Sequence, residues 1–528
     1  MKASSITGHP ARSTVYGPAL WLALLLPLAL LLPPVPIDET RYLTVAWNML
    51  GSGQWLVPTI DGAWYSDKSP LLFWLIAGGW KLAGVYTFVA RVEALIIALG
   101  VLLGTRRLGA RLGLDARGAD AALWLLAGCL GFTVFATAIM FDLLLALCVL
   151  GAVHALLDLD AGKWKRGMAA LGVMLGLGLL AKGPVMLLHV FALAMLAPLW
   201  SATARAHKAR WYLALLAGLL LGVLIVACWL LPAAWYAGPA YWQPLLDKVT
   251  GRVVDSFAHR RPWWWYLPLV PVLVLPWLLT LRAPWAAWAG LWRSRLGVFL
   301  ACWWVLPFVG FCAISGKQIH YLLPLLPAWA LAGAWLLQQA GAGVRRAWLA
   351  VLALVAAVGI AGLPWLAAAQ FAVPVRPAVA GLALVPVAVI LGVWCGWGRD
   401  VRGLALYATA LLSATALAGA FAYWPALDVA PEAGFVRQTL EARIPLATIE
   451  PANGLFGYSG RLREPVPWIA GTAVQAWCRA HPNGILLTTG RHDEPKSVAP
   501  LKTWPYVLSG DHRIAAWHAA AVLGAARR

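Results

Sequence analysis

The sequence predicts an all-α polytopic membrane protein with a small α/β domain at its C-terminal end. Hydrophobic residues make up 62% of the 528 residues and charged residues only 12%, and the mean hydropathy is +0.76. A soluble globular domain contains about 45–50% apolar and about 25% charged residues. A cytosolic enzyme, a disordered protein and a disulfide scaffold are therefore excluded. The apolar residues also form long stretches, whereas residues 424–528 are polar.

We predict about thirteen membrane spans, because thirteen apolar stretches come near the roughly 20 residues that a helix needs to cross a bilayer. No cleavable signal peptide is expected, since prolines interrupt the first stretch and no A-x-A site follows it. With a cytoplasmic N-terminus, every predicted inside segment carries at least two Lys or Arg residues, as the positive-inside rule requires. The net charge of +20 thus fits cytoplasmic loops, and no nucleic-acid partner is expected. The stretches are 18–36, 84–103, 119–140, 143–158, 168–182, 185–200, 211–232, 266–281, 297–314, 321–338, 347–367, 378–397 and 403–423.

Two segments do not fit simple spanning. Residues 37–83 form a long outer segment with amphipathic runs at about 40–51 and 70–81, which we expect to be helices lying along the membrane surface. Residues 424–528 contain strand-like runs such as Ile485–Thr489 and are expected to form the α/β domain. An odd number of spans places this domain opposite the N-terminus. The sequence thus predicts a membrane domain over 1–423 and an outer domain over 424–528.

Polar residues follow the first predicted span directly, as Asp38-Glu39-Thr40-Arg41-Tyr42. Adjacent carboxylates at the outer end of a helix can accept a proton, position a cation or hold a metal. The alternative interpretation is an ordinary solvated loop in which an Asp caps the following helix.

A second polar group, Tyr65-Ser66-Asp67-Lys68-Ser69-Pro70, precedes an apolar run. Its Pro suits the first turn of a helix. Lys68 is suited to bind a phosphate as a point charge, and a solvated loop is again the alternative.

Two single charges stand between apolar runs. Asp142 lies among Met and Leu residues with no cation next to it, and an ionisable group in such a place is functional by default. Lys182 lies between two apolar stretches, where it is either functional or a snorkelling Lys at a helix end.

Two further groups are cationic. His259-Arg260-Arg261-Pro262 places two arginines on the predicted outer side, against the positive-inside trend, and arginine pairs bind phosphate in fork geometry. Lys317 and Tyr321 would share a face if that stretch were helical.

All five groups fall on one predicted side of the membrane. Together they describe a site at the outer membrane edge, with acids for proton transfer and cations for an anionic group. A lipid-linked phosphate substrate would suit such a site.

The chain resembles the bacterial aminoarabinose transferase branch of the protein O-mannosyltransferase-like glycosyltransferases, which have the GT-C fold. The resemblance covers roughly the first 340 residues and depends on an ordered set of motifs. These are D-E-T-R-Y at 38–42, G-x-W-x-x-P at 53–58, Y-S-D-K-S-P-L-L-F-W-L at 65–75, F-D-L-L-L-A-L at 141–147, A-K-G-P at 181–184 and K-Q-I-H-Y-L-L-P-L-L-P at 317–327.

The resemblance implies a role for several residues. Asp38 becomes the leading catalytic acid/base and Asp142 the second acid, while Tyr42, Tyr65, Lys68 and Tyr321 match positions near the donor phosphate or the catalytic cavity. Asp67 stands where the branch often has Glu, and a divalent metal held by Asp67 and His259 is a candidate cofactor. The other expected substrate-binding or phosphate-binding residues are Glu39, Arg41, Lys182, Arg260, Arg261 and Lys317.

The resulting hypothesis is an inner-membrane inverting glycosyltransferase that acts on the periplasmic face. The donor would be a sugar on undecaprenyl phosphate, with 4-amino-4-deoxy-L-arabinose as a candidate, and the acceptor lipid A or another envelope glycolipid or glycan. A protein O-glycosyltransferase with the same fold is one alternative. A lipid or sugar transporter that uses Asp142 and Lys182 near the midplane is another.

Overall fold

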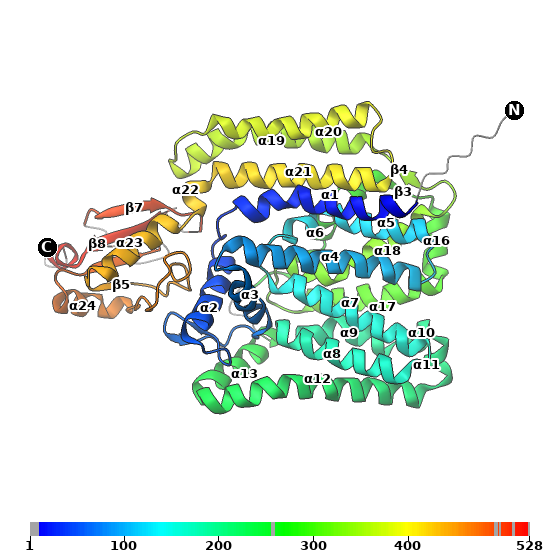
Figure 1. Ribbon diagram of the computed structural model, residues 1–528, viewed down its shortest axis with the longest axis horizontal. Coiled ribbons are helices and arrows are strands. Elements are labelled where there is room, and N and C mark those ends of the chain that lie inside the picture. The colour runs from blue at the N-terminus through cyan, green and yellow to red at the C-terminus, as the bar shows by residue number, and fades with distance from the viewer. Residues whose placement is uncertain (1–9, 255–258, 490–494, 496–497, 509–512, 526–528) are drawn as a thin grey trace.

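The computed structural model describes residues 10–254, 259–489, 495, 498–508 and 513–525. Long helices lie side by side with their axes in nearly one direction, and a small sheet domain lies beyond one end of them (Figure 1). The predicted class, an all-α polytopic membrane bundle, is confirmed.

Among the described residues, eight helical segments are long and apolar enough to cross a membrane. Two of them begin with a turn of 3₁₀ helix, Ile319–Leu325 (η2) and Pro377–Ala383 (η3), which continue as α18 and α20. The eight are α4 (Thr87–Arg111), α7 (Phe141–Asp160), α12 (Lys208–Ala237), α17 (Arg295–Ala313), η2 with α18 (Leu326–Leu337), α19 (Ala347–Phe371), η3 with α20 (Leu384–Trp394) and α21 (Val401–Ala422).

The other five predicted spans coincide with helices that are shorter, interrupted or more polar, so the count of thirteen stays a prediction. Prolines explain much of the interruption, since a proline lacks the N–H that continues a helix. Pro268 and Pro276, for example, each directly precede a short helix between residues 266 and 281. The five regions contain α1 (Pro10–Leu31), α5 (Ala116–Ala127) with α6 (Leu130–Phe135), α8 (Trp164–Lys182), α9 (Val185–Met195) with α10 (Ala197–Trp200), and η1 (Trp263–Tyr266) with α14 (Leu269–Leu273) and α15 (Trp277–Thr280).

The centre of the bundle is α7, most of whose apolar residues are buried. By contrast, α12 and α19 leave most of their apolar surface exposed, as expected of helices that face lipid. Helices α8 and α12 pack closely because α8 presents glycines. A Cβ atom on Gly172 would lie 2.7 Å from Leu221, and one on Gly176 would lie 2.8 Å from Ile225.

The segment 37–83 contains both predicted amphipathic helices, α2 (Asp38–Ser52) and α3 (Leu71–Ala83). The short hairpin of β1 (Thr59–Ile60) and β2 (Ala63–Trp64) connects them. In Figure 1 both helices lie at the end of the bundle, between it and the sheet domain. This placement puts the polar residues of the segment at one end of the molecule.

The C-terminal region forms a four-stranded sheet with strand order β5-β6-β8-β7, in which β5 and β6 are parallel. It has its own hydrophobic cluster, which includes Val436, Leu446 and Ile514. The predicted strand at 485–489 is confirmed as β6. The boundary at 423 and the periplasmic location of the domain stay predictions. The elements here are α22 (Trp424–Leu427), α23 (Ala430–Glu441), β5 (Leu446–Thr448), η4 (Gly471–Ala473), α24 (Val474–Ala480), β6 (Ile485–Thr488), β7 (Lys502–Pro505), β8 (Arg513–His518) and α25 (Ala519–Ala525).

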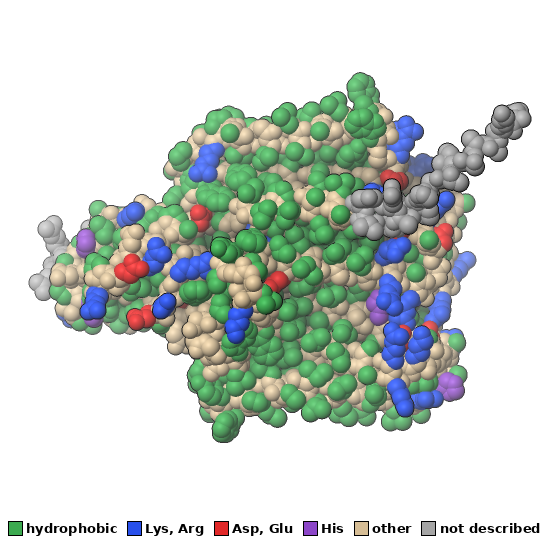
Figure 2. Space-filling model, in the orientation of Figure 1, with side chains coloured by type: hydrophobic (Ala, Val, Ile, Leu, Met, Phe, Trp, Pro, Cys, Tyr) green, Lys and Arg blue, Asp and Glu red, His purple; other side chains and the backbone are tan. Residues whose placement is uncertain are grey.

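Charge is distributed unevenly along the bundle. On the face shown in Figure 2, a broad band of hydrophobic side chains separates the C-terminal domain from a group of Lys and Arg side chains at the far end. That far end contains α11 (Ala202–Ala206), α16 (Trp285–Arg293), the C-terminal end of α4 and the N-terminal end of α8 (Figure 1). The positive-inside rule predicts that such an end faces the cytoplasm, and this orientation stays a prediction. The remaining elements are α13 (Pro239–Val254), β3 (Leu281–Arg282) and β4 (Gly343–Val344).

Candidate active site at the end facing the C-terminal domain

Asp142 lies in the first turn of α7, where a helix favours negative charge. Its side chain is only 2% exposed and forms an ion pair with Lys182, the last residue of α8. The sequence separates these residues by 40 positions, and the packing of α7 against α8 brings them together. The two single charges of the sequence thus neutralise each other.

The segment η2 adds two side chains to this pair. His320 Nε2 lies 3.7 Å from Asp142 Oδ2, and Lys182 Nζ lies 4.2 Å from the centre of the Tyr321 ring. His320 was not among the predicted site residues, although it lies inside the motif at 317–327. A second ionisable residue three positions after Lys317, in the same motif, was the signal that could have found it.

Asp38 begins α2 and differs from Asp142 in its exposure. Its side chain is 38% exposed, and Arg41 lies 3.8 Å away. The Tyr42 hydroxyl donates a hydrogen bond of 3.3 Å to Asp38 Oδ1, and the Tyr42 ring packs edge-on against Phe141 at 4.9 Å. Tyr42 therefore connects the start of α2 to the start of α7, next to Asp142.

The loop before α3 approaches the same place. Arg41 and Asp67 both interact electrostatically with Tyr65, and Asp38 and Lys68 interact with His320. Burial raises the pKa of both Tyr42 and Tyr65 above the ordinary value of a tyrosine. Both phenols are therefore neutral at physiological pH and keep their protons as hydrogen-bond donors.

The segment 259–261 runs beside 315–317, and these pairings place it next to η2. Arg260 pairs with Gly316, and the Lys317 amide donates a hydrogen bond of 3.0 Å to the His259 carbonyl. Arg260 and Arg261 are both exposed, and so their guanidinium groups are accessible to an anion.

The expectation for Lys317 needs correction. Its residue is 2% exposed, and its ammonium group donates to the carbonyls of Ile314 and, at 3.3 Å, Arg261. Burial also lowers its pKa. The 3₁₀ helix begins only at Ile319, so Lys317 does not share a helix face with Tyr321. Lys317 holds two chain segments together and is not placed to bind phosphate.

Glu39 also differs from expectation. Its carboxylate is 6% exposed and lies 2.5 Å from Arg91 of α4. It also accepts hydrogen bonds from the amides of Val35 at 2.8 Å and Ile139 at 3.0 Å. Both carboxylate oxygens are thus used within the protein, and we assign Glu39 to the anchoring of α2 and not to substrate binding. Arg91 was missed, although the rule that singled out Asp142 also applies to an arginine within an apolar stretch.

The candidate metal ligands Asp67 and His259 do not form part of a larger cluster. Within the described ranges, no group of three or more His, Cys, Asp or Glu residues is arranged to hold a metal ion. His259 is exposed. A metal ion held by Asp67 and His259 therefore stays a prediction.

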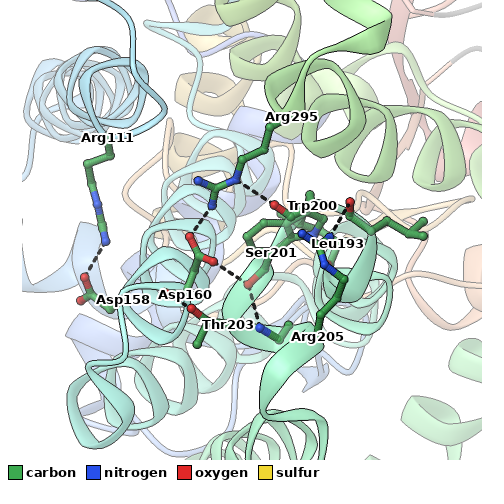
Figure 3. Close-up of polar contacts among 11 residues, drawn as sticks. Arg111, Asp158, Asp160, Leu193, Trp200, Ser201, Thr203, Arg205 and Arg295 are labelled. Carbon is green, nitrogen blue, oxygen red and sulfur yellow. Dashed lines mark hydrogen bonds and ion pairs between the residues drawn. The ribbon is translucent and has the colours of Figure 1, made fainter.

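The opposite end of the bundle has a polar network of a different kind (Figure 3). Asp160 forms an ion pair with Arg295 and accepts a hydrogen bond of 2.5 Å from Ser201. Asp158 is paired with Arg111 at 2.6 Å and Arg166 at 3.0 Å. Here arginines neutralise both acids, and so the network connects helix ends. The side chains of Asp158 and Asp160 are both less exposed than that of Asp38.

Fold and site together define the class of the protein: a polytopic helical membrane protein with acidic and cationic side chains at the end facing a small C-terminal domain. The fold is shared with crystal structures of ArnT from Cupriavidus metallidurans. The structure bound to undecaprenyl phosphate matches with a TM-score of 0.75 and 20% identity, over 98% of this chain and 99% of that chain. The apo structure matches with a TM-score of 0.76 and 21% identity over the same shares.

Sequence comparison points to particular relatives. Residues 67–231 match the family described as dolichyl-phosphate-mannose-protein mannosyltransferase. The chain is 33% identical over 347 residues to undecaprenyl phosphate-alpha-4-amino-4-deoxy-L-arabinose arabinosyl transferase 1 of Pseudomonas fluorescens, covering 60% of this chain and 58% of that protein. It is 33% identical over 345 residues to the transferase of the same description from Pseudomonas aeruginosa PAO1, with 60% of each covered. The chain spans about three fifths of the length of these relatives, and its resemblance to the aminoarabinose transferase branch is confirmed.

Proposed function

We propose that this chain is an inverting glycosyltransferase that moves a sugar from undecaprenyl phosphate to lipid A or another envelope acceptor. The observation that carries the proposal is the contrast between two acids at one end of the bundle. Asp38 is 38% exposed, whereas Asp142 is 2% exposed and paired with Lys182. One carboxylate is thus accessible to substrate, in surroundings rich in cations. The relatives' names support undecaprenyl phosphate as the donor carrier and 4-amino-4-deoxy-L-arabinose as the sugar.

Asp38 is the proposed general base. The acceptor oxygen attacks the anomeric carbon of the sugar, and a new C–O bond forms while the bond from that carbon to the phosphate oxygen breaks. The proton on the acceptor oxygen passes to Asp38, and undecaprenyl phosphate leaves with the electron pair of the broken bond. Attack opposite the leaving group inverts the anomeric centre. Tyr42 and Arg41, both next to Asp38, hold its carboxylate in place.

The departing phosphate gains negative charge, because a phosphodiester becomes a phosphomonoester. Cations placed where that charge develops stabilise the transition state. Lys68 and the exposed Arg260 and Arg261 are the proposed phosphate ligands. Arginine suits the fork geometry of phosphate oxygens, while lysine acts as a point charge.

Asp142 is proposed as a positioning residue and not as a second base. It orients Lys182 and lies near His320, and its neighbour Phe141 supports the Tyr42 ring. Lys182 in turn lies over the ring of Tyr321. In this arrangement, Asp142 and Lys182 support the packing of α2, which carries Asp38.

Lipid A as acceptor, the periplasmic face and the cytoplasmic N-terminus are parts of the same proposal. The basic far end of the bundle (Figure 2) supports the orientation. The first test is mass spectrometry of envelope lipids from cells with the gene deleted and then restored. Loss and return of one sugar mass on lipid A supports the proposal. The same change on a protein would move the acceptor to protein.

A second test uses purified protein with a sugar on undecaprenyl phosphate and lipid A. The Asp38→Asn variant keeps the size of the side chain and removes the base, so transfer should fall by at least 100-fold, within the usual range for a general base. The control is Glu441→Gln, at a carboxylate that is 69% exposed in the C-terminal domain. Transfer by Asp38→Asn at the rate of that control would refute the assignment.

A further inference from the structure

A cavity of about 450 Å³ lies where α2 meets the C-terminal domain, apart from the site described above. Its size falls within the roughly 300–1,000 Å³ typical of small-ligand sites. One wall is the later part of α2, from Thr44 to Ser52, and another is the loop 452–466 of the C-terminal domain. The turn of the β1–β2 hairpin contributes Asp61 and Gly62.

Hydrogen bonds between the walls show that the cavity is part of the fold. Thr44 Oγ1 donates to the Gly454 carbonyl at 2.6 Å and accepts from the Tyr458 amide at 2.9 Å. Trp47 Nε1 donates to the Leu462 carbonyl at 2.7 Å. The Gly454 amide donates to Asp61 Oδ2 at 3.1 Å. These bonds join α2, the hairpin and the loop, so the cavity exists before any ligand arrives.

The lining combines an aromatic ring with hydrogen-bonding groups of both kinds. Trp47 contributes the ring, Asn48 an amide and Asp61 a carboxylate, and the exposed Arg463 and Glu464 stand at the loop. A sugar ring can lay its C–H face on an indole while its hydroxyls exchange hydrogen bonds with amide, carboxylate and guanidinium groups. The two acids outnumber the one arginine, and so the lining does not favour a phosphate group. A hydroxyl-rich saccharide is the ligand chemistry that fits.

The cavity lies on the same helix as the proposed base. Asn48 follows Asp38 by ten residues in α2, which at 1.5 Å per residue is about 15 Å along the helix axis. A ligand in the cavity is therefore separate from the reacting atoms, but a larger molecule can reach both. Contacts far from the reacting oxygen can raise the affinity for the acceptor without changing the chemical step.

We propose that this cavity is an acceptor subsite that binds saccharide rings remote from the oxygen that receives the sugar. The inference rests on the proposed transferase function and adds a role for the C-terminal domain, whose loop 452–466 forms one wall. Domain and α2 together would thus select acceptors that present sugar rings about 15 Å from the acceptor oxygen.

Gly51 offers a way to fill the cavity without disturbing the fold. It lines the cavity, and a Cβ atom added there meets nothing within 4 Å. A Gly51→Phe variant would add an aromatic ring at the wall of the cavity. The matched control is Gly434→Phe on α23, where an added Cβ atom also meets nothing within 4 Å, and Gly434 does not line the cavity.

Steady-state transfer with the full chain in nanodiscs is the first measurement. Gly51→Phe should raise the KM for lipid A at least tenfold and leave the KM for the donor and kcat within twofold, because remote binding contributes equally to ground and transition states. Gly434→Phe should match the wild type. An unchanged KM for lipid A in Gly51→Phe would overturn the subsite.

Direct binding separates this inference from the transferase proposal. The probe is the glucosamine disaccharide obtained by deacylating and dephosphorylating lipid A, and binding is measured by native mass spectrometry of nanodiscs. Maltoside detergents are avoided because they offer a competing disaccharide. The wild type and Gly434→Phe should bind it, and Gly51→Phe should bind at least tenfold more weakly. Equal binding by Gly51→Phe, or no binding by the wild type, refutes the subsite. Selective loss of binding without any transfer by the wild type supports the subsite and refutes the transferase.

Discussion

Removing one partner of the buried ion pair of Glu39 and Arg91 should strongly destabilise the start of α2. The Arg91 guanidinium donates to Glu39 at 2.5 Å, to the Leu32 carbonyl at 2.5 Å and to the Pro33 carbonyl at 2.7 Å. The side chains of Arg91 and Glu39 are only 2% and 6% exposed. One arginine therefore holds the end of α1, the linker and the first turn of α2 together.

The Arg91→Met substitution keeps much of the side-chain volume but leaves the Glu39 charge buried with no cation and two carbonyls with no donor. Breaking a buried pair by removing one partner costs about 3–5 kcal/mol. At roughly 2–4 °C per kcal/mol for chains of 150–250 residues, and less for a longer chain, the apparent midpoint of thermal unfolding should fall by about 5–10 °C. Transfer should fall with it, because α2 carries Asp38.

The assay is tryptophan fluorescence during heating of the purified protein, for wild type, Arg91→Met, Glu39→Gln and the double variant. The double variant should be more stable than Arg91→Met, since it contains no uncompensated buried charge. The matched control is the surface pair Arg437–Glu441, 48% and 69% exposed, whose disruption should change stability by less than about 1 kcal/mol. A midpoint for Arg91→Met within 1 °C of the control, or additive effects in the double variant, would refute the reasoning.

Three further predictions follow from the same structure. Asp142→Asn leaves Lys182 buried without its counter-charge, so transfer and thermal stability should both fall. Adding Lys182→Met should restore part of the stability but not the transfer. Full activity of Asp142→Asn would contradict the positioning role. Lys68→Gln should weaken binding of undecaprenyl phosphate by about tenfold or more, which is the usual effect of losing a charged hydrogen-bond partner. Titration of the protein in nanodiscs measures this affinity. An unchanged affinity would exclude Lys68 from the phosphate site. Burial raises the pKa of Glu432 in α23 to about 8 from 4.5, and so the folded domain holds a proton that the unfolded chain releases between about pH 4.5 and 8. The stability of the C-terminal domain should therefore decrease as pH rises through that window, and hydrogen exchange of β5 and β6 measures this decrease. Glu432→Gln should make the stability less dependent on pH. The same pH dependence in that variant as in the wild type would contradict the role of Glu432.

The C-terminal domain has a clear structural relation to the site. Its loop binds α2 through Thr44 and Trp47, and Arg461 donates to the Val85 carbonyl at 2.8 Å, just before α4. The Tyr458 ring also stacks on Trp80 of α3 at 5.1 Å. The domain thus supports the elements around Asp38 from the side opposite the bundle.

The sequence by itself determined the membrane class and the presence of helices α2 and α3. It also singled out Asp38, Asp142 and Lys182 as charged residues next to apolar stretches. These inferences depend on composition and on local periodicity, which are properties of short stretches of chain. The motifs also carried the resemblance to the aminoarabinose transferase branch. The interrupted helices between 266 and 281 show the limit of hydropathy, because apolar character does not reveal where prolines end a helix.

Only the tertiary structure decided which charges meet. Lys182 pairs with Asp142 across 40 residues, Glu39 with Arg91 across 52, and Thr44 bonds to Gly454 across 410. The same packing separated the partly exposed Asp38 from the buried Asp142, placed Glu39 and Lys317 in hydrogen bonds within the protein, and formed the cavity between α2 and the C-terminal domain. Such pairings depend on how helices pack in three dimensions, and local sequence contains no record of the distance between side chains that are far apart along the chain.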